Sequence, residues 1–205
     1  MDAGRRGREN AAVEITHAVA NGADTEADTG TAPDAGARVH PPAHADADAV
    51  AELHTASWRT AYADLFPAHY LNGPLLEERR AVWRGRLADP VPGAALFLAR
   101  EAGTLLGFVY LEPRPDGRIL IDNLHARPGE TGRGLGGRLL AHALAWSATT
   151  HPGKDVYLEV LQGNTRAVAF YERQGGRRTD SRICHFDEGF ALPEFEYTWP
   201  AAVPK

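Results

Sequence analysis

The chain has 205 residues, of which 43 % are hydrophobic, and a formal net charge of −5, which fits one globular domain with an extension better than two domains. The negative charge argues against a protein whose main task is to bind nucleic-acid phosphates, so we expect no nucleic-acid partner. No apolar run approaches the roughly 18 residues of a membrane span, and no apolar stretch follows the arginines near the N-terminus, so we expect no secretory signal, no membrane partner and a cytoplasmic protein.

The N-terminal segment differs in composition from the rest of the chain. After the first methionine its large apolar residues are Val13, Ile15 and Val19. From residue 21 onward it consists mainly of Ala, Gly, Thr, Asp and Glu. Such a segment cannot bury enough apolar surface to offset its conformational entropy. We therefore expect a disordered tail over residues 1–37 and a folded domain over residues 38–205.

Two helices are predicted at the start of the domain. The first begins at Asp46 or Asp48, either of which can cap it, and runs to about Tyr62. The second follows the sequence NGP at residues 72–74 and ends before the DP pair at 89–90. Proline suits the first turn of a helix and disfavours a helical residue before it, so it marks both the start and the end of this element.

Strands alternate with helices in the remainder of the chain. We predict, in order, a hairpin of strands 96–100 and 105–112, a strand over 118–126, a helix over about 135–147, a strand over 156–160, a short helix capped by Asn164, and one or two strands from about residue 182 onward. This order predicts an α/β fold, in which a mixed sheet carries helices on its faces.

A glycine-rich loop lies between the strand over 118–126 and the helix that follows it. Its residues are Thr131, Gly132, Arg133, Gly134, Leu135, Gly136 and Gly137. Glycines let backbone N–H groups converge on a ligand, and the helix N-terminus adds about half a positive charge, so the loop could bind a pyrophosphate. A dinucleotide site would lie earlier in a βαβ unit, and a nucleoside-triphosphate loop would need Gly-Lys-Ser/Thr. A purely structural turn remains the alternative.

Three stretches resemble the GNAT superfamily of acetyl-CoA-dependent N-acetyltransferases. Residues 124–140 (LHARPGETGRGLGGRLL) are similar to the strand, pyrophosphate loop and helix of that family. Residues 156–178 (VYLEVLQGNTRAVAFYERQGGRR) are similar to its next strand and helix, and residues 57–71 (SWRTAYADLFPAHYL) to the first helix and loop of many bacterial members. The similarity covers about residues 39–199. In one departure, Thr131 stands where the family usually has Gln or Arg.

The resemblance implies a GNAT-like fold with acetyl-CoA as co-substrate. Its central sheet would be mixed and mostly antiparallel, with helices on both faces and a splayed strand pair at the CoA site. The loop would hold the pyrophosphate of CoA, with Arg133 supplying charge that is absent at Thr131, and the preceding strand would pair with the pantetheine arm. The cofactor-binding residues implied are Leu124, His125, Ala126, Thr131, Gly132, Arg133, Gly134, Leu135, Gly136, Gly137 and Asn164.

The resemblance also implies direct attack of an amine on the thioester. Tyr171 matches the tyrosine that often protonates the leaving thiolate in that family; simple packing against the acyl chain is the alternative. The candidates for the base are Asp122, Glu112, Glu159 and His125. We select Asp122, acting through water, against the alternative of a substrate-orienting or solvated carboxylate. Strict strand alternation would place Asp122 with Leu120 and Leu124, opposite His125.

The first helix carries His54, Trp58 and Tyr62 at helical spacing. We assign them to the substrate site, with core packing as the alternative. Cys184, the single cysteine, is expected to be inert, and no Cys or His spacing predicts a metal. We therefore expect an N-acetyltransferase acting on a primary amine of a small molecule or peptide, with a homodimer as one open arrangement. A non-catalytic acyl-CoA-binding sensor and an enzyme using a longer acyl-CoA are the alternatives.

Overall fold

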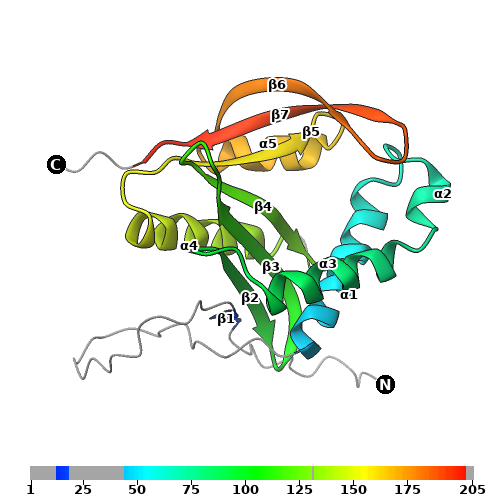
Figure 1. Ribbon diagram of the computed structural model, residues 1–205, viewed down its shortest axis with the longest axis horizontal. Coiled ribbons are helices and arrows are strands. Elements are labelled where there is room, and N and C mark those ends of the chain that lie inside the picture. Colours follow the sequence, from blue (N-terminus) through cyan, green and yellow to red (C-terminus); the bar gives the residue numbers. More distant parts are fainter. Residues whose placement is uncertain (1–12, 19–43, 131, 202–205) are drawn as a thin grey trace, which may run out of the picture.

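The computed structural model describes residues 13–18, 44–130 and 132–201 (Figure 1). Its elements follow the predicted order, with β1 and α2 in addition. In chain order they are β1 (Glu14–His17), α1 (His44–Ala61), α2 (Ala68–Leu71), α3 (Leu75–Ala88), β2 (Ala95–Glu101), β3 (Thr104–Pro113), β4 (Ile119–Ala126), α4 (Leu135–Thr150), β5 (Val156–Leu161), α5 (Thr165–Arg173), β6 (Arg177–His185) and β7 (Ala191–Trp199).

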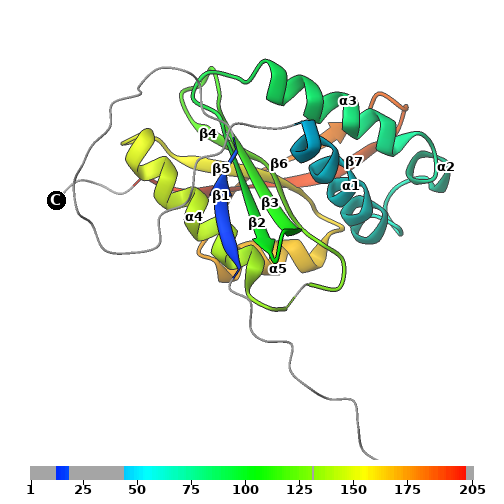
Figure 2. The same ribbon diagram turned by 90° about the horizontal axis from the view of Figure 1, so that it is seen from below.

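The strands form a single sheet in the order β1-β2-β3-β4-β5-β7-β6. Every neighbouring pair is antiparallel except β4 and β5, which are parallel. Helices α4 and α5 lie on one face, and α1 and α3 lie on the other (Figure 2). The predicted α/β fold, with a mixed and mostly antiparallel sheet, is confirmed.

The parallel pair opens shortly after it begins. Strands β4 and β5 pair only at Ile119 with Val156 and at Leu120 with Tyr157. Beyond these two pairs β4 continues to Ala126 with β3 alone, while β5 continues with β7 (Figure 1). Among the described residues, the edge of β4 that faces β5 therefore has no strand partner over its second half.

A β-bulge lies in β4 at the start of this opening. Leu111 of β3 pairs with Ile121, whereas Tyr110 pairs with Asn123, so Asp122 is the extra residue on β4. A bulge changes the side on which the following side chains project. The structure therefore corrects the strict alternation expected from the sequence.

The two halves of β4 consequently use different positions to face α4. Before the bulge Ile121 is part of the apolar cluster beneath α4, and after it Leu124 and Ala126 pack against the same cluster. His125 points to the other side, where its ring meets His54 of α1. Leu124 therefore lies on the face of Ile121, not opposite to it.

Three apolar clusters hold the elements together. One joins the sheet to α4 and α5 and includes Val109, Leu139, Leu158 and Tyr171. The second joins it to α1 and α3 and includes Val50, Trp83, Leu98 and Phe108. The third joins α1, α2 and the β6–β7 turn through Trp58, Tyr62, Phe66, Tyr70, Phe186 and Phe190. Packing of this kind fixes the helices that flank the opening between β4 and β5.

Residues 13–18 differ from the expected disordered tail. Glu14–His17 pair with Phe97–Arg100 of β2 as an edge strand. His17 stacks on Phe97 with ring centroids 4.8 Å apart, and Arg138 of α4 donates to the carbonyl of Val13 at 2.8 Å. A four-residue strand in polar surroundings gives little sequence signal, because its partners lie about 80 residues away. The rest of the 1–37 segment lies outside the described residues.

Candidate functional site

The glycine-rich loop leads into the N-terminus of α4. Gly132 and Gly134 have φ values of +90° and +76°, a left-handed conformation that glycine adopts with little cost, and Gly134 caps the helix. A Cβ atom added at either position would meet no atom within 4 Å. The Cβ directions at these two positions are therefore unobstructed, and the first N–H groups of α4, which have no intrahelical acceptor, follow directly. Thr131 lies outside the described residues.

The later glycines of the motif face a different neighbour. A Cβ atom at Gly136 would lie 3.4 Å from the ring of Phe170, and one at Gly137 would lie 3.3 Å from the side-chain oxygen of Gln174. Both contacts are with α5. These glycines therefore allow α4 and α5 to pack closely, while their backbone N–H groups remain in the first turns of α4. The side chain of Leu135 is buried in the core.

Arg133 is exposed and already paired. It forms ion pairs with Glu130 of the same loop and with Glu101 of β2, the latter at 3.1 Å. These two carboxylates partly neutralise the positive charge that Arg133 could offer to a phosphate.

Helix α5 brings two predicted residues to the carboxyl end of β5. Asn164 caps the helix, because its Oδ1 accepts from the N–H of Ala167 at 3.2 Å. Its side chain also hydrogen-bonds to the hydroxyl of Tyr62 at the end of α1. Tyr171 is buried, and burial together with the nearby Tyr62 raises the pKa of its phenol. The structure thus brings Tyr62, Asn164 and Tyr171 together from two elements.

Helix α1 forms the wall that faces the end of β4. Ser57 Oγ lies 3.0 Å from Nδ1 of His125, and the rings of His54 and His125 are 4.5 Å apart. Trp83 donates its indole N–H to Nδ1 of His54 at 3.1 Å. His54 is 3 % exposed, so it lies behind His125 in the wall, while Trp58 is partly exposed.

Both histidines of this wall are held neutral. Burial, followed by the positive charge of Arg79, lowers the pKa of His125 to about 3. Burial also lowers the pKa of His54, with further contributions from His125, Arg79 and Arg86. Since Trp83 can only donate, Nδ1 of His54 is the acceptor and its proton resides on Nε2. That Nε2 is buried without a hydrogen-bond partner among the described residues.

The three carboxylate candidates for the base are each paired with an arginine. Asp122 lies 2.6 Å from Arg86 and accepts a hydrogen bond from Asn123 at 2.5 Å. Glu112 pairs with Arg114 at 2.8 Å and also accepts from the hydroxyl of Tyr110. Glu159 pairs with Arg182. In contrast, the hydrogen-bonding partner of His125 is the neutral hydroxyl of Ser57.

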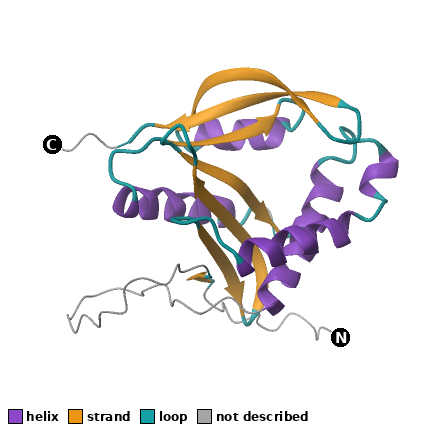
Figure 3. Ribbon diagram, in the orientation of Figure 1, coloured by secondary structure: helices purple, strands orange, loops and turns teal. Residues whose placement is uncertain are grey.

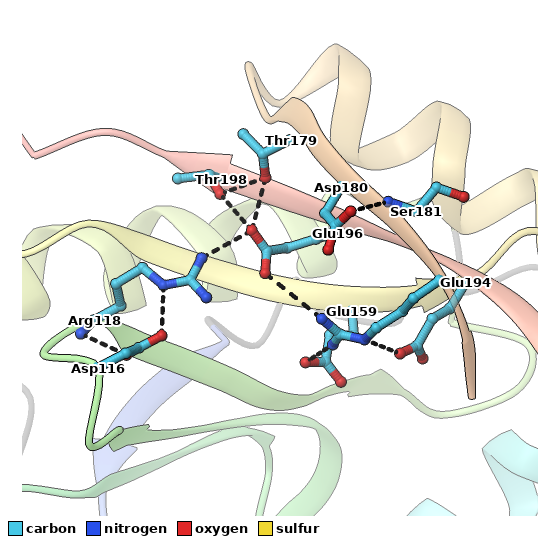
Figure 4. Close-up of polar contacts among 10 residues, drawn as sticks. Asp116, Arg118, Glu159, Thr179, Asp180, Ser181, Glu194, Glu196 and Thr198 are labelled. Carbon is cyan, nitrogen blue, oxygen red and sulfur yellow. Dashed lines mark hydrogen bonds and ion pairs between the residues drawn. The ribbon is translucent and has the colours of Figure 1, made fainter. Parts of the chain in front are cut away.

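Glu159 belongs to a larger polar network that sequence analysis missed. Arg182 of β6 forms ion pairs with Glu159, Glu194 and Glu196, with a 2.8 Å contact to Glu194. Figure 4 shows these three carboxylates close together. Arg118 joins Glu196 at 2.8 Å from the start of β4 (Figure 4). In the sequence, the alternation of Glu194, Phe195 and Glu196 indicates a strand with one polar face. The arginines that pair with these glutamates come from other parts of the chain, so local sequence does not reveal them. The network ties β5, β6 and β7 together on the face opposite α5.

Arg79 of α3 is a second residue that the sequence did not single out. Its guanidinium lies 4.5 Å from the centre of the Trp58 ring and donates to the hydroxyl of Tyr70 at 3.3 Å. Within the described part of the chain it forms no ion pair. An arginine inside a helix gives no sequence signal of such a position, because the position depends on how α3 packs against α1.

The described ranges hold neither a membrane-spanning helix nor a cluster of metal ligands. No helix in residues 13–18, 44–130 and 132–201 is both long and apolar enough to cross a bilayer. The same residues contain no group of three or more His, Cys, Asp or Glu side chains arranged to hold a metal ion. Figure 3 shows the helices in purple and the strands in orange, and the candidate site is the opening between β4 and β5.

Comparisons with known proteins agree with this architecture. The model of the acetyltransferase (GNAT) family matches residues 48–176. A protein of Mycobacterium tuberculosis named "Probable N-acetyltransferase" is 30 % identical over 135 residues, which is 61 % of this chain and 71 % of that protein. Mycothiol acetyltransferase of Thermobispora bispora is 34 % identical over 114 residues, which is 51 % of this chain and 37 % of that protein.

Solved structures show the same fold at lower identity. PaiA N-acetyltransferase of Thermoplasma acidophilum, in complex with coenzyme A, has a TM-score of 0.60 and 19 % identity, covering 74 % of this chain and 92 % of that one. The ribosomal-protein-S18-alanine N-acetyltransferase of Escherichia coli has a TM-score of 0.58 and 17 % identity, covering 78 % and 91 %. Together with the family match over residues 48–176, these findings show that the chain belongs to the acetyltransferase (GNAT) family, which uses acetyl-CoA.

Proposed function

We propose that this protein transfers an acetyl group from acetyl-CoA to a primary amine of a small molecule or peptide. The observation that carries the proposal is the opening of β4 and β5 after two residue pairs, beside an open glycine loop. An extended ligand arm can add to the free edge of β4 as a strand would, and its phosphates can reach the helix N-terminus. The chain offers both features to one ligand.

The proposed ligand contacts follow from this placement. The N–H groups of residues 132–137 would hold the pyrophosphate, and the backbone of residues 124–126 would hold the pantetheine arm. Asn164 would contact the pantetheine arm at the start of α5, since its side chain already caps that helix and hydrogen-bonds to Tyr62. Bound acetyl-CoA supplies the activated thioester, and the side chains around it orient the acceptor.

We propose Tyr171 as the acid in the transfer. The nitrogen of the free amine forms a bond to the thioester carbon, and the C–S bond breaks as the tetrahedral intermediate collapses. The sulfur leaves as a thiolate and takes the proton of the Tyr171 hydroxyl, while the new amide nitrogen gives up the proton that restores the phenol, directly or through water. A phenol whose pKa is raised by burial stays protonated until the thiolate forms.

Acetyl-CoA titration followed by an amine panel tests this function. We expect calorimetry to show binding and a free-thiol assay to show CoA release that depends on the amine. The panel should include small polyamines, amino sugars, amino acids and short peptides, with acetyl-CoA alone as the blank. Binding without release for any amine would favour the sensor alternative, and faster turnover of a longer acyl-CoA would favour the second alternative. Absence of binding would overturn the proposal.

A further inference from the structure

We propose that His125 receives the acceptor amine: Nε2 of its uncharged ring accepts an N–H of the attacking amine, Ser57 fixes the ring, and Arg79 disfavours a charged acceptor. This inference rests on the proposed function and deepens it. It places His125 beside the amine, where the sequence selected Asp122 as a base acting through water.

The three carboxylates that could serve as the base already have arginine partners. Oδ2 of Asp122 lies 2.6 Å from the guanidinium of Arg86 and accepts from the side-chain amide of Asn123 at 2.5 Å, so this carboxylate already has a cationic partner. Glu112 and Glu159 are paired with arginines in the same way. A carboxylate that must leave an arginine before it can accept a proton is a poor receiver. His125 has no charged partner to leave.

The ring of His125 is held in one orientation. Ser57 contacts Nδ1 at 3.0 Å, His54 lies against one face at 4.5 Å, and Phe108 of β3 lies at 5.4 Å. The opposite nitrogen, Nε2, has no hydrogen-bond partner among the described residues. Unlike Nε2 of His54, this atom is not fully buried, and His125 is partly exposed. With Nδ1–H donated to Ser57 Oγ, Nε2 presents a lone pair.

Arg79 sets the charge that the site tolerates. The charged groups that change the pKa of the two rings are Arg79 and Arg86 from α3, and each histidine also faces the other. Among the described residues, no carboxylate contributes to either pKa shift. Burial and Arg79 lower the pKa of His125 to about 3, so the ring is neutral at every pH at which amines react. The same surroundings act on an ammonium placed against Nε2, since it is also a cation. The acceptor is therefore held as the free amine.

The proton balance follows from this arrangement. An acceptor that arrives as an ammonium releases one proton to water before it binds, and the free amine then donates an N–H hydrogen bond to Nε2 with its lone pair toward the thioester. After the C–N bond forms, the nitrogen loses its second proton to water, and Tyr171 supplies the proton that the thiolate takes. Water returns one proton to Tyr171, so one acetyl transfer from an ammonium releases one proton overall.

The first test reads the ring directly and needs no acceptor. Nitrogen-15 NMR of the histidine rings in the full chain should show His125 as the neutral Nδ1–H tautomer from about pH 5 to about pH 8. Ser57→Ala should remove the tautomer preference, and Arg79→Gln should raise the pKa of the ring. A ring that protonates near its ordinary pKa, or that carries its proton on Nε2, overturns the proposal.

The second test compares two amines, propylamine, which is charged at neutral pH, and trifluoroethylamine, which is not. His125→Leu should lower kcat about 100-fold for both, with unchanged acetyl-CoA affinity, and His125→Gln should restore part of it through its amide oxygen. Arg79→Gln should lower kcat at neutral pH for propylamine alone and move its pH midpoint upward. His151→Gln is the matched control, because His151 is a half-buried histidine bonded to the carbonyl of Gly93 at 3.0 Å.

The outcomes separate this inference from the proposed function. If Asp122→Asn lowers kcat more than His125→Leu does, the amine contact belongs to Asp122 and the inference fails while the function stands. If the two amines respond alike to Arg79→Gln, the role of Arg79 fails. If the wild-type protein neither binds acetyl-CoA nor releases CoA with any amine, the proposed function fails, and the ring tautomer still decides whether Nε2 can accept.

Discussion

Tyr171 and Tyr110 are both buried phenols, but their surroundings differ. Burial raises the pKa of both, together with Tyr62 for Tyr171 and with Glu112 for Tyr110. Tyr110 donates to Glu112 at 3.2 Å within the sheet. Tyr171 instead lies on α5 beside Tyr62, whose hydroxyl hydrogen-bonds to Asn164. Tyr171 can therefore be tested as the proposed acid, with Tyr110 as the control.

We expect Tyr171→Phe to lower kcat by about 100-fold, which is the ordinary contribution of a positioned acid. The affinity for acetyl-CoA, measured by calorimetry, should change little, because the ring and its packing remain. Because the raised pKa keeps the phenol protonated, the wild-type kcat should show no loss that depends on Tyr171 up to about pH 10. Tyr110→Phe should keep kcat within a few-fold of wild type. Equal rates for wild type and Tyr171→Phe, with chemistry rate-limiting, would exclude the acid role.

The sequence predicted some single residues of this site and missed others for a clear reason. Asn164 and Tyr171 lie inside a local motif, so their spacing alone places them on one short helix. The pairing of Asp122 with Arg86 and the approach of Arg79 to His125 join α3 to β4 through residues that are 36 or more positions apart in the chain. No local pattern encodes such a contact, because it depends on how α3 packs on α1.

At the level of elements, the loop before α4 and the edge of β4 form the proposed CoA site. Most helices and strands of the fold were predictable from the sequence. Periodicity and turn residues predict each of them from α1 to α5, with the exception of α2. The bulge at Asp122 was not predictable, because a bulge is visible only in the register with β3. The strand β1 was also missed, because its stability comes from the exposed edge of β2 and from Arg138, not from its own composition.

The loop assignment can be tested with two glycines in the same conformation. Gly134 and Gly153 both have φ = +76°, and an added Cβ at either meets no atom within 4 Å. Glutamate at either position should cost about 1–2 kcal/mol of stability, because L-residues resist the left-handed conformation. Only Gly134→Glu also places a negative charge where the pyrophosphate would bind. Calorimetry should show at least an approximately 100-fold loss of acetyl-CoA affinity for Gly134→Glu and nearly wild-type affinity for Gly153→Glu. Equal affinities would refute the loop assignment.

At the scale of the whole molecule, neutral histidines lie on both faces of the sheet. His17 and His142 lie beside Phe97 on the side of α4, and His54 and His125 lie on the side of α1. Burial lowers the pKa of all four. The fold therefore depends on these rings staying uncharged, so acid is expected to act on both layers at once.

The sign of the pH dependence follows from linkage. An unfolded histidine takes up a proton near pH 6.5, whereas His125 in the folded protein does so at about pH 3. Between these values the unfolded state binds more protons, so stability falls as the pH falls. At about pH 5 the loss from His125 alone is on the order of 2 kcal/mol. Glu194, whose pKa burial raises, acts in the opposite direction, so the two contributions must be separated.

Urea unfolding of the wild type and of His125→Leu at about pH 7.5 and about pH 5 separates them. The free energy of unfolding of the wild type should fall between the two pH values, and the variant should lose about 2 kcal/mol less, since only the ring of His125 differs. His185→Leu is the matched control, because His185 is exposed on β6 and its loss should leave the pH dependence unchanged. An equal fall in the wild type and in His125→Leu would mean that His125 is already charged or solvated in the folded protein, and would also remove the reason for expecting a neutral receiver at this position.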